Sequence, residues 1–285
     1  MGNPVLYYMR CVTAVAILML CAVYGTIASI VCNIIGKQHL SQWTTARCYY
    51  YAMKFGMGID VKVIGEEKLD NKPFIAVSNH QSALDILMLA RMFPKGCTVT
   101  AKKSLKYVPL LGWFMAASGT FFLDRSSRQK SVDTLNRGLR QVKEKKRALW
   151  IFPEGTRSYA TDLSILPFKK GAFHLAQQGD IPIVPIVVSN TSTLMNPKNK
   201  VFNRGVMTVK VLDPVSTDGL TKEDIGAFSE KIRESMVETL QEIGYSKPVN
   251  ETNLPQDYID YVTKKRVAEE SEDSKSKGAS TGVSA

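Results

Sequence analysis

A long stretch without a charged residue, from Cys11 to Ile35, constrains this chain more than any other feature of its sequence. At a rise of about 1.5 Å per residue, a helix over this stretch is long enough to cross a hydrocarbon core about 30 Å thick. The stretch is too long for an ordinary signal peptide and lacks a convincing small-residue cleavage site. We therefore expect a membrane anchor that the protein retains.

The next segment, from Leu40 to Met57, mixes apolar and charged residues. Aromatic residues such as Trp43 lie on one side of its helical pattern, and Arg47 and Lys54 interrupt it. This pattern predicts an amphipathic helix that lies among the lipid headgroups. Residues 1–58 are therefore expected to form membrane-embedded or interfacial helices.

Beyond residue 58, short apolar runs alternate with helical stretches, which is the pattern of an α/β domain. Strands are expected at residues 60–64, 74–77, 98–101, 120–123, 148–152, 183–188 and 206–212. Helices are expected at residues 83–93, 108–117, 127–145, 171–178 and 221–243. This domain is expected to cover residues 59–248, followed by a C-terminal extension over residues 249–285. From about Val267 the extension is rich in Ser, Lys, Glu and Gly, which predicts a disordered tail.

The chain of 285 residues has a formal net charge of +11, so its surface attracts polyanions. The candidate polyanions are anionic lipid headgroups, phosphorylated substrates and nucleic acid. No zinc-finger, helix-turn-helix or aromatic RNA-binding signature is visible in the sequence, whereas a long apolar segment is. We therefore expect a membrane surface as a partner and no nucleic acid.

Cysteine and histidine residues lack the spacing of a metal site. The cysteines are Cys11, Cys21, Cys32, Cys48 and Cys97, and the histidines are His39, His80 and His174. We expect reduced cysteines that serve in packing, and no metal centre built from these residues. A carboxylate-bound magnesium ion is compatible with the sequence but is not required by it.

The segment Asn79–Asp85 places a histidine and a carboxylate five residues apart. Residues 73–77 predict a buried strand and residues 83–93 a helix, so His80 is expected in the connecting loop. Side chains five residues apart on one helix diverge, and His80 can therefore meet Asp85 only from that loop. This geometry suits a general base whose ring is oriented by a carboxylate.

A purely structural interpretation of the same residues stays open. Ser82 and Asp85 match a capping box, in which the carboxylate accepts backbone N–H groups at the start of a helix. His80 is then an ordinary polar loop residue. The heptapeptide alone favours neither interpretation, because short motifs recur by chance.

Three further blocks follow in the chain, namely Gly119–Arg125, Phe152–Ser158 and Val184–Val187. Together with the first block, and with Phe168–Phe173 between the last two, they resemble the signature motifs of the PlsC-type glycerolipid acyltransferases. The residues of these motifs look most like those of eukaryotic lysophosphatidic acid acyltransferases of the fungal type. The resemblance runs from about Val61 to Leu212.

The resemblance implies a mixed central sheet flanked by helices, the glycerolipid acyltransferase fold, with an N-terminal membrane-embedded helical pair. In that family two such helices dip into one leaflet, so spanning and re-entrant arrangements of the first helix both remain open. The implied enzyme is an acyl-CoA-dependent 1-acyl-sn-glycerol-3-phosphate O-acyltransferase, which acylates the sn-2 hydroxyl of lysophosphatidic acid to form phosphatidic acid. Acyl-CoA, lysophosphatidic acid and membrane lipids are the expected partners, and no cofactor is expected.

Acyl transfer to an alcohol requires that the hydroxyl lose its proton as it attacks, and a neutral imidazole suits this task. His80 is the expected catalytic base, and Asp85 is expected to fix its tautomer and to stabilise the imidazolium. The resemblance implies direct transfer, because the substrate hydroxyl is itself the nucleophile. Ser82 is therefore expected to cap the helix rather than to act as a nucleophile.

A glycerophosphate substrate needs cations and backbone donors, and the segment Glu154–Arg157 offers both. Arg157 is the expected bidentate phosphate ligand, and Gly155 permits close approach of the backbone. Glu154 is expected to orient Arg157 or the glycerol hydroxyls, with a structural ion pair as the alternative. Substrate binding is thus assigned here to Glu154, Gly155, Thr156 and Arg157.

The resemblance assigns two further cations to substrate binding. Arg125 is expected to face the phosphate and Lys103 to lie beside the substrate, with a solvated surface position as the alternative for both. The apolar helix at 108–117 is expected to line an acyl channel or to belong to the core. Val184–Val187 is expected to shape the acyl-CoA pocket, and Lys169–Lys170 to meet CoA phosphates or anionic lipid.

Alternative functions stay open at this point. They are acyl transfer to another lysophospholipid or to glycerol-3-phosphate, thioester hydrolysis by water, and a non-catalytic membrane scaffold that binds anionic lipids. We expect the membrane of the endoplasmic reticulum, with the lipid droplet as an alternative, and a catalytic domain on the cytosolic face. The glycosylation sequons at Asn190 and Asn250 are then expected to be unused.

Overall fold

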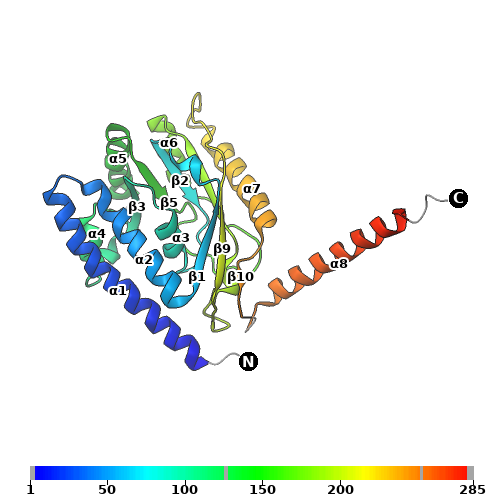
Figure 1. The fold of residues 1–285 in the computed structure, drawn as a ribbon. Coiled ribbons are helices and arrows are strands. Elements are labelled where there is room, and N and C mark those ends of the chain that lie inside the picture. Colours follow the sequence, from blue (N-terminus) through cyan, green and yellow to red (C-terminus); the bar gives the residue numbers. More distant parts are fainter. Residues whose placement is uncertain (1–3, 125–127, 251–252, 281–285) are drawn as a thin grey trace.

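The computed structural model describes residues 4–124, 128–250 and 253–280 (Figure 1). Its centre is an eight-stranded sheet with the order β1-β9-β6-β2-β5-β3-β4, and β10 pairs with β9. The strands are β1 (Ile59–Ile64), β2 (Phe74–Ser78), β3 (Cys97–Lys102), β4 (Phe121–Leu123), β5 (Ala148–Ile151), β6 (Ile183–Val188), β9 (Gly205–Val211) and β10 (Lys247–Pro248). Strand β9 runs antiparallel to β6 and β10, whereas the other pairs are parallel. The mixed sheet implied by the sequence is therefore confirmed.

Helices cover both faces of this sheet. They are α1 (Pro4–Ile34), α2 (Ser41–Met57), α3 (Asp85–Met92), α4 (Leu111–Ala117), α5 (Arg128–Glu144), α6 (Gly171–Gly179) and α7 (Ile225–Ile243). Trp150 and Ile186 face a core that includes α2 and α3, whereas their neighbours Leu149 and Val187 face a core that includes α5, α6 and α7. Because successive strand residues point to opposite faces, strands covered on both sides must be continuously apolar, as β2, β5 and β6 are.

The N-terminal helix α1 is the one helix among the described residues that is long and apolar enough to cross a membrane. It packs along α2 and α4 (Figure 1), and most of its apolar side chains remain exposed. The second helix differs, because α2 buries Tyr49, Met53 and Met57 against the domain and carries polar residues at its start. The expected membrane-embedded pair is therefore corrected to one apolar helix, with α2 exposing Tyr51 and Phe55 beside it.

The expected strands are all present, and none of their ends differs by more than one residue. Helix α3 begins later than expected, because its first turn has the tighter bonds from the Ile86 N–H to the Ala83 carbonyl and from the Leu87 N–H to the Leu84 carbonyl. The short strands β7 (Met195–Asn196) and β8 (Val201–Phe202), which form a separate hairpin, were not predicted.

The C-terminal extension is described as far as residue 280. Helix α8 (Gln256–Ser280) continues past Val267 and projects away from the body of the protein (Figure 1). A segment rich in Lys, Glu and Ser without proline has adequate helix propensity, and its lack of apolar residues predicts only that it does not pack. The disordered tail expected from about Val267 and the division at residues 58 and 248 both stay predictions.

Candidate active site

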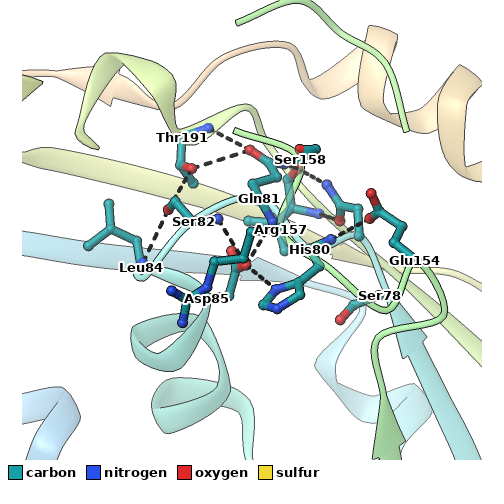
Figure 2. A network of polar contacts seen from close by, with 12 residues as sticks. Ser78, His80, Gln81, Ser82, Leu84, Asp85, Glu154, Arg157, Ser158 and Thr191 are labelled. Atoms are coloured by element: carbon teal, nitrogen blue, oxygen red, sulfur yellow. Dashed lines mark hydrogen bonds and ion pairs between the residues drawn. The ribbon is translucent and has the colours of Figure 1, made fainter. Parts of the chain in front are cut away.

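The loop between β2 and α3 carries the histidine and its carboxylate. His80 Nδ1 lies 2.6 Å from Asp85 Oδ2, so the contact expected from their spacing is present (Figure 2). Asp85 is only 1% exposed, while the side chain of His80 is 18% exposed. The carboxylate is thus withdrawn from solvent behind an imidazole that a substrate can reach.

The capping contacts of the structural interpretation are present as well. Asp85 Oδ2 also accepts the backbone N–H groups of Gln81, at 2.7 Å, and Ser82, at 3.1 Å. Ser82 Oγ accepts the N–H of Leu84 at 3.1 Å, and the serine is 2% exposed. One carboxylate therefore holds the loop and the ring together, and the two interpretations of the motif are compatible.

Two amide side chains on either side of His80 attach this loop to the end of β6. Asn79 Nδ2 donates to the Val188 carbonyl at 2.9 Å, and the Val188 N–H donates to Asn79 Oδ1 at 2.8 Å. Gln81 Nε2 donates to the same carbonyl at 2.9 Å, and its Oε1 accepts the N–H of Thr191 at 2.8 Å. The sequence had shown both residues inside the motif, but their positioning role becomes visible only with β6 in place.

Glu154 lies beneath the histidine loop rather than in a substrate-facing position. It is 4% exposed, its Oε1 accepts the His80 N–H at 2.5 Å, and its Oε2 accepts the Leu166 N–H at 3.2 Å. Burial, with a smaller contribution from the nearby charge of Asp85, raises the pKa of this carboxyl to about 7, although the two backbone hydrogen bonds oppose the rise. The carboxylate therefore holds the backbone of His80 in place. Among the described residues, Glu154 forms neither the expected ion pair nor the expected contact with Arg157.

The segment after Glu154 packs directly against the histidine. The N–H groups of Ser158 and Tyr159 donate to the carbonyls of His80 and Gln81, at 2.9 and 3.0 Å. The ring of Phe152 stacks on the imidazole with the centroids 4.1 Å apart and an interplanar angle of 24°. These contacts bring the first and third sequence blocks together and fix the plane of the imidazole.

A glycine allows a lysine to join this site. Gly155 has a φ of +72°, which favours glycine, and a Cβ atom at this position would lie 2.7 Å from Lys169 Nζ. Lys169 also donates its backbone N–H to the Pro153 carbonyl at 2.9 Å. The side chain of Lys169 therefore passes directly over the backbone that leads to Thr156 and Arg157.

A cavity of about 690 Å³, which we call the catalytic cavity, opens beside His80. Its cationic lining consists of Lys102, Arg157 and Lys169. Part of its apolar lining comes from the helices α1 to α4 and includes Leu18, Ala22, Tyr49, Leu89, Phe114 and Met115. The contribution from α4 is the one expected of an acyl channel. The arrangement joins a base, cations and a long apolar surface in one space.

The remaining expected site residues lie elsewhere. Lys103 Nζ forms an ion pair with Asp124 Oδ2 at 2.9 Å and lines a different cavity, while its neighbour Lys102 lines the catalytic cavity. Arg125 lies outside the described residues. Strand β6, expected to shape the acyl-CoA pocket, is wholly buried inside the sheet, and its last residue Val188 donates its N–H to Asn79 in the histidine loop. Among the residues described, no three His, Cys, Asp or Glu side chains group as metal ligands, and the cysteines are free.

Comparison with known proteins identifies the family. Residues 60–189 match the acyltransferase family model. The chain is 66% identical over 257 residues to the 1-acyl-sn-glycerol-3-phosphate acyltransferase of Saccharomyces cerevisiae, an alignment that covers 90% of this chain and 85% of that protein. The chain belongs to the acyltransferase family. The alpha form of the human 1-acyl-sn-glycerol-3-phosphate acyltransferase is 35% identical to this acyltransferase over 214 residues, covering 75% of each.

A solved structure shares the fold of this acyltransferase. The crystal structure of the 1-acyl-sn-glycerophosphate acyltransferase PlsC from Thermotoga maritima matches with a TM-score of 0.66, covering 84% of this chain and 99% of that one. At 21% sequence identity this match establishes the fold alone.

The geometry of the acyltransferase's site suits proton transfer. Nδ1 of His80 is engaged by Asp85, so Nε2 is the ring nitrogen that remains for a substrate. An imidazole held in this way can accept a proton, and the adjacent carboxylate stabilises the imidazolium that results.

Proposed function

We propose that this acyltransferase transfers a fatty acyl group from acyl-CoA to the sn-2 hydroxyl of lysophosphatidic acid, which forms phosphatidic acid. The observation that carries the proposal is the catalytic cavity, where the His80–Asp85 pair, three cations and a long apolar surface meet. An acceptor with a hydroxyl, a phosphate and an acyl chain needs these three kinds of group. The yeast and human relatives are named as 1-acyl-sn-glycerol-3-phosphate acyltransferases, which supports this acceptor.

In the proposed reaction, His80 Nε2 removes the proton of the sn-2 hydroxyl while the oxygen attacks the thioester carbonyl. A C–O bond forms and the C–S bond breaks, and the imidazolium then returns the proton to the departing thiolate. Asp85 holds the ring and stabilises its positive charge between these two transfers. Every proton and electron pair is accounted for without a covalent enzyme intermediate, and no cofactor takes part in these steps.

The acceptor phosphate is proposed to bind the cations nearest to His80. Arg157 supplies a planar fork for two phosphate oxygens, and Lys169 and Lys102 add charge within the same cavity. Gly155 and Thr156 also line the cavity and bring backbone close to the phosphate. Substrate roles for Lys103, Arg125 and Glu154 remain sequence-based predictions.

The enzyme is proposed to act at a membrane through α1, with its catalytic domain on the cytosolic face of the endoplasmic reticulum or of lipid droplets derived from it. Acyl-CoA is supplied on that face, and the sequon at Asn190 is buried in the folded domain on whichever side the domain lies. Asn190 is 2% exposed and donates to the carbonyls of Ala160 and Asp162, at 3.1 and 2.6 Å. A sequon asparagine held in this way is inaccessible to a glycosyltransferase in the folded protein.

The test is an acceptor panel given to the purified protein with acyl-CoA in lipid vesicles. We expect CoA release that depends on lysophosphatidic acid, with phosphatidic acid as the product, and much lower rates with lysophosphatidylcholine or glycerol-3-phosphate. The variant His80→Ala is the control and should lose the reaction. Release of CoA without any acceptor would favour a thioesterase, and equal rates on neutral lysolipids would overturn the phosphate assignment. A wild type that transfers no acyl group to any acceptor would favour the non-catalytic scaffold.

A further inference from the structure

A second cavity of about 630 Å³, which we call the basic groove, is not used by the proposed reaction. Its lining carries four cations, Lys103, Lys106, Arg137 and Arg140. It also contains the carboxylates Asp124 and Asp133 and the aromatic rings of Tyr107 and Phe122. Four positive and two negative groups leave a net charge of +2, so the groove favours an anion, and its two rings add flat apolar surfaces.

The basic groove and the catalytic cavity share a thin wall. In each of the consecutive pairs Lys102–Lys103, Phe122–Leu123 and Thr134–Leu135, one residue lines the catalytic cavity and its neighbour lines the basic groove. Neighbouring Cα atoms are about 3.8 Å apart, so the two spaces adjoin at β3, at β4 and at α5. A long molecule that occupies both spaces has to pass over the rim of this wall, because β3 and β4 are paired with each other.

The proposed reaction has two anionic substrates, and the two spaces divide the cations between them. In the acceptor, the carbon that carries the phosphate is bonded to the carbon that carries the reacting hydroxyl, so the cations for this phosphate must lie in the cavity that contains His80, as Arg157 and Lys169 do. In the donor, the flexible pantetheine arm separates the thioester from the phosphates. The cations that hold those phosphates must therefore lie outside the catalytic cavity but beside it, which describes the basic groove.

The side chains of the groove also suit a nucleotide. The 3′-phospho-ADP end of CoA carries about four negative charges and one purine ring. Lys103 is paired with Asp124 but its side chain is half exposed, and Arg137 donates to Thr134 Oγ1 at 3.2 Å, so both cationic tips are held at the groove. Tyr107 is 73% exposed, which leaves its ring available for stacking on a base.

We propose that the basic groove binds the 3′-phospho-ADP end of the acyl-CoA donor, while Arg157 and Lys169 hold the phosphate of the acceptor. The inference rests on the proposed function, because it assumes a CoA thioester as the donor. It also requires the pantetheine arm to run from the groove over the rim of the wall at β3 and β4 to the thioester beside His80.

The test uses the double variant Arg137→Glu/Arg140→Glu, which reverses two exposed charges on α5. The matched control is Lys143→Glu/Lys231→Glu, which makes the same change in net charge at exposed positions outside the groove. Binding of adenosine 3′,5′-bisphosphate to the full-length protein is measured by calorimetry, so this readout needs no acyl transfer. We expect the Kd to rise about tenfold or more in the double variant and to stay near the wild-type value in the control, because each charge-assisted contact to phosphate is strong.

Kinetics provide the second readout. The KM for acyl-CoA should rise by a similar factor in the double variant, while kcat at saturating donor and the KM for lysophosphatidic acid stay within about twofold, which also shows that the variant folds. The single variant Lys106→Glu, at an exposed position across the groove, should shift the same two donor constants and serves if the double variant is unstable.

Unchanged nucleotide binding in both variants overturns the proposal, as does a rise in the KM for lysophosphatidic acid instead of acyl-CoA. Equal losses in the double variant and its control point to general surface charge and also overturn it. Loss of binding to anionic vesicles with unchanged nucleotide binding assigns the groove to lipid headgroups. A wild type that binds the nucleotide as expected but transfers no acyl group refutes the proposed function and leaves the nucleotide site standing.

Discussion

Replacement of Glu154 by glutamine should change the stability of the protein in a pH-dependent way. The carboxyl is 4% exposed, and burial raises its pKa from an ordinary value of 4.5 to about 7. A raised pKa means that the folded protein binds the proton more tightly than the unfolded chain does. This contribution to stability is fully present below about pH 4.5 and is lost as the pH rises through about 7.

The size of the effect follows from the shift. A difference of one pKa unit corresponds to about 1.4 kcal/mol, so this shift is worth about 3 kcal/mol between the two ends of the pH window. Glutamine does not titrate, so at every pH it corresponds to the protonated carboxyl and avoids the roughly 3 kcal/mol that burial of the ionised carboxylate costs at high pH. It also presents an NH₂ group to one of the two backbone N–H donors, of His80 or Leu166, at a cost of about 1–3 kcal/mol at every pH.

Glu154→Gln should therefore be less stable than the wild type at pH 5 and should equal or exceed it at pH 8. Melting temperatures of both proteins in the same detergent measure this, and the difference between them should move by roughly 5–10 °C across the window. Infrared titration of the protonated carboxyl band, taken as wild type minus variant, reports the proton directly. The reasoning would be refuted by a stability difference that does not change between pH 5 and pH 8, or by one that increasingly favours the wild type as the pH rises.

Two further substitutions test the geometry of the site. Asp85→Asn keeps an oxygen for the loop N–H groups but removes the charge beside His80. In steady-state assays kcat should therefore fall about 10³- to 10⁴-fold with little change in KM. A loss of kcat below tenfold would contradict the role of the carboxylate. Gly155→Ala should lower the melting temperature by more than Gly36→Ala does. Both glycines have φ near +70°, but the new methyl group meets nothing at position 36 and collides with Lys169 at position 155, so equal losses would show that backbone strain alone matters.

The sheet was predictable from the sequence because its strands are short, continuous and apolar. Residues 74–77 and 183–188 form such runs, and a strand covered by helices on both faces has no other pattern available. The two-residue strands of the β7–β8 hairpin escaped prediction, because segments that short carry no periodicity. For the tail, composition indicates whether the segment packs against the rest of the protein and is a weaker guide to whether it forms a helix such as α8.

The contact of His80 with Asp85 was predictable because both partners lie in one loop, where spacing fixes geometry. The partners of Glu154 were not, since the His80 N–H that it accepts lies 74 positions away in the chain. Position 154 stands in a block whose neighbours Gly155 and Arg157 do line the catalytic cavity, and this proximity suggested a substrate role for the carboxylate as well. Local spacing predicts contacts within a segment, while contacts between segments depend on the register of the strands that carry them.

The lysines at the end of β3 show a further limit of prediction from the sequence. Lys102 ends β3 and Lys103 begins the short 3-10 helix η3 (Lys103–Tyr107), so the turn of the chain between these elements decides which lysine faces the base, and the sequence does not say which one does. In the structure Lys102 lines the catalytic cavity and Lys103 lines the basic groove. Lys102→Met should therefore raise the KM for lysophosphatidic acid more than that for acyl-CoA, and Lys103→Met should do the reverse. Steady-state kinetics with each substrate varied in turn would measure both effects, and two variants with the same profile would show that the wall between the cavities does not separate the substrates.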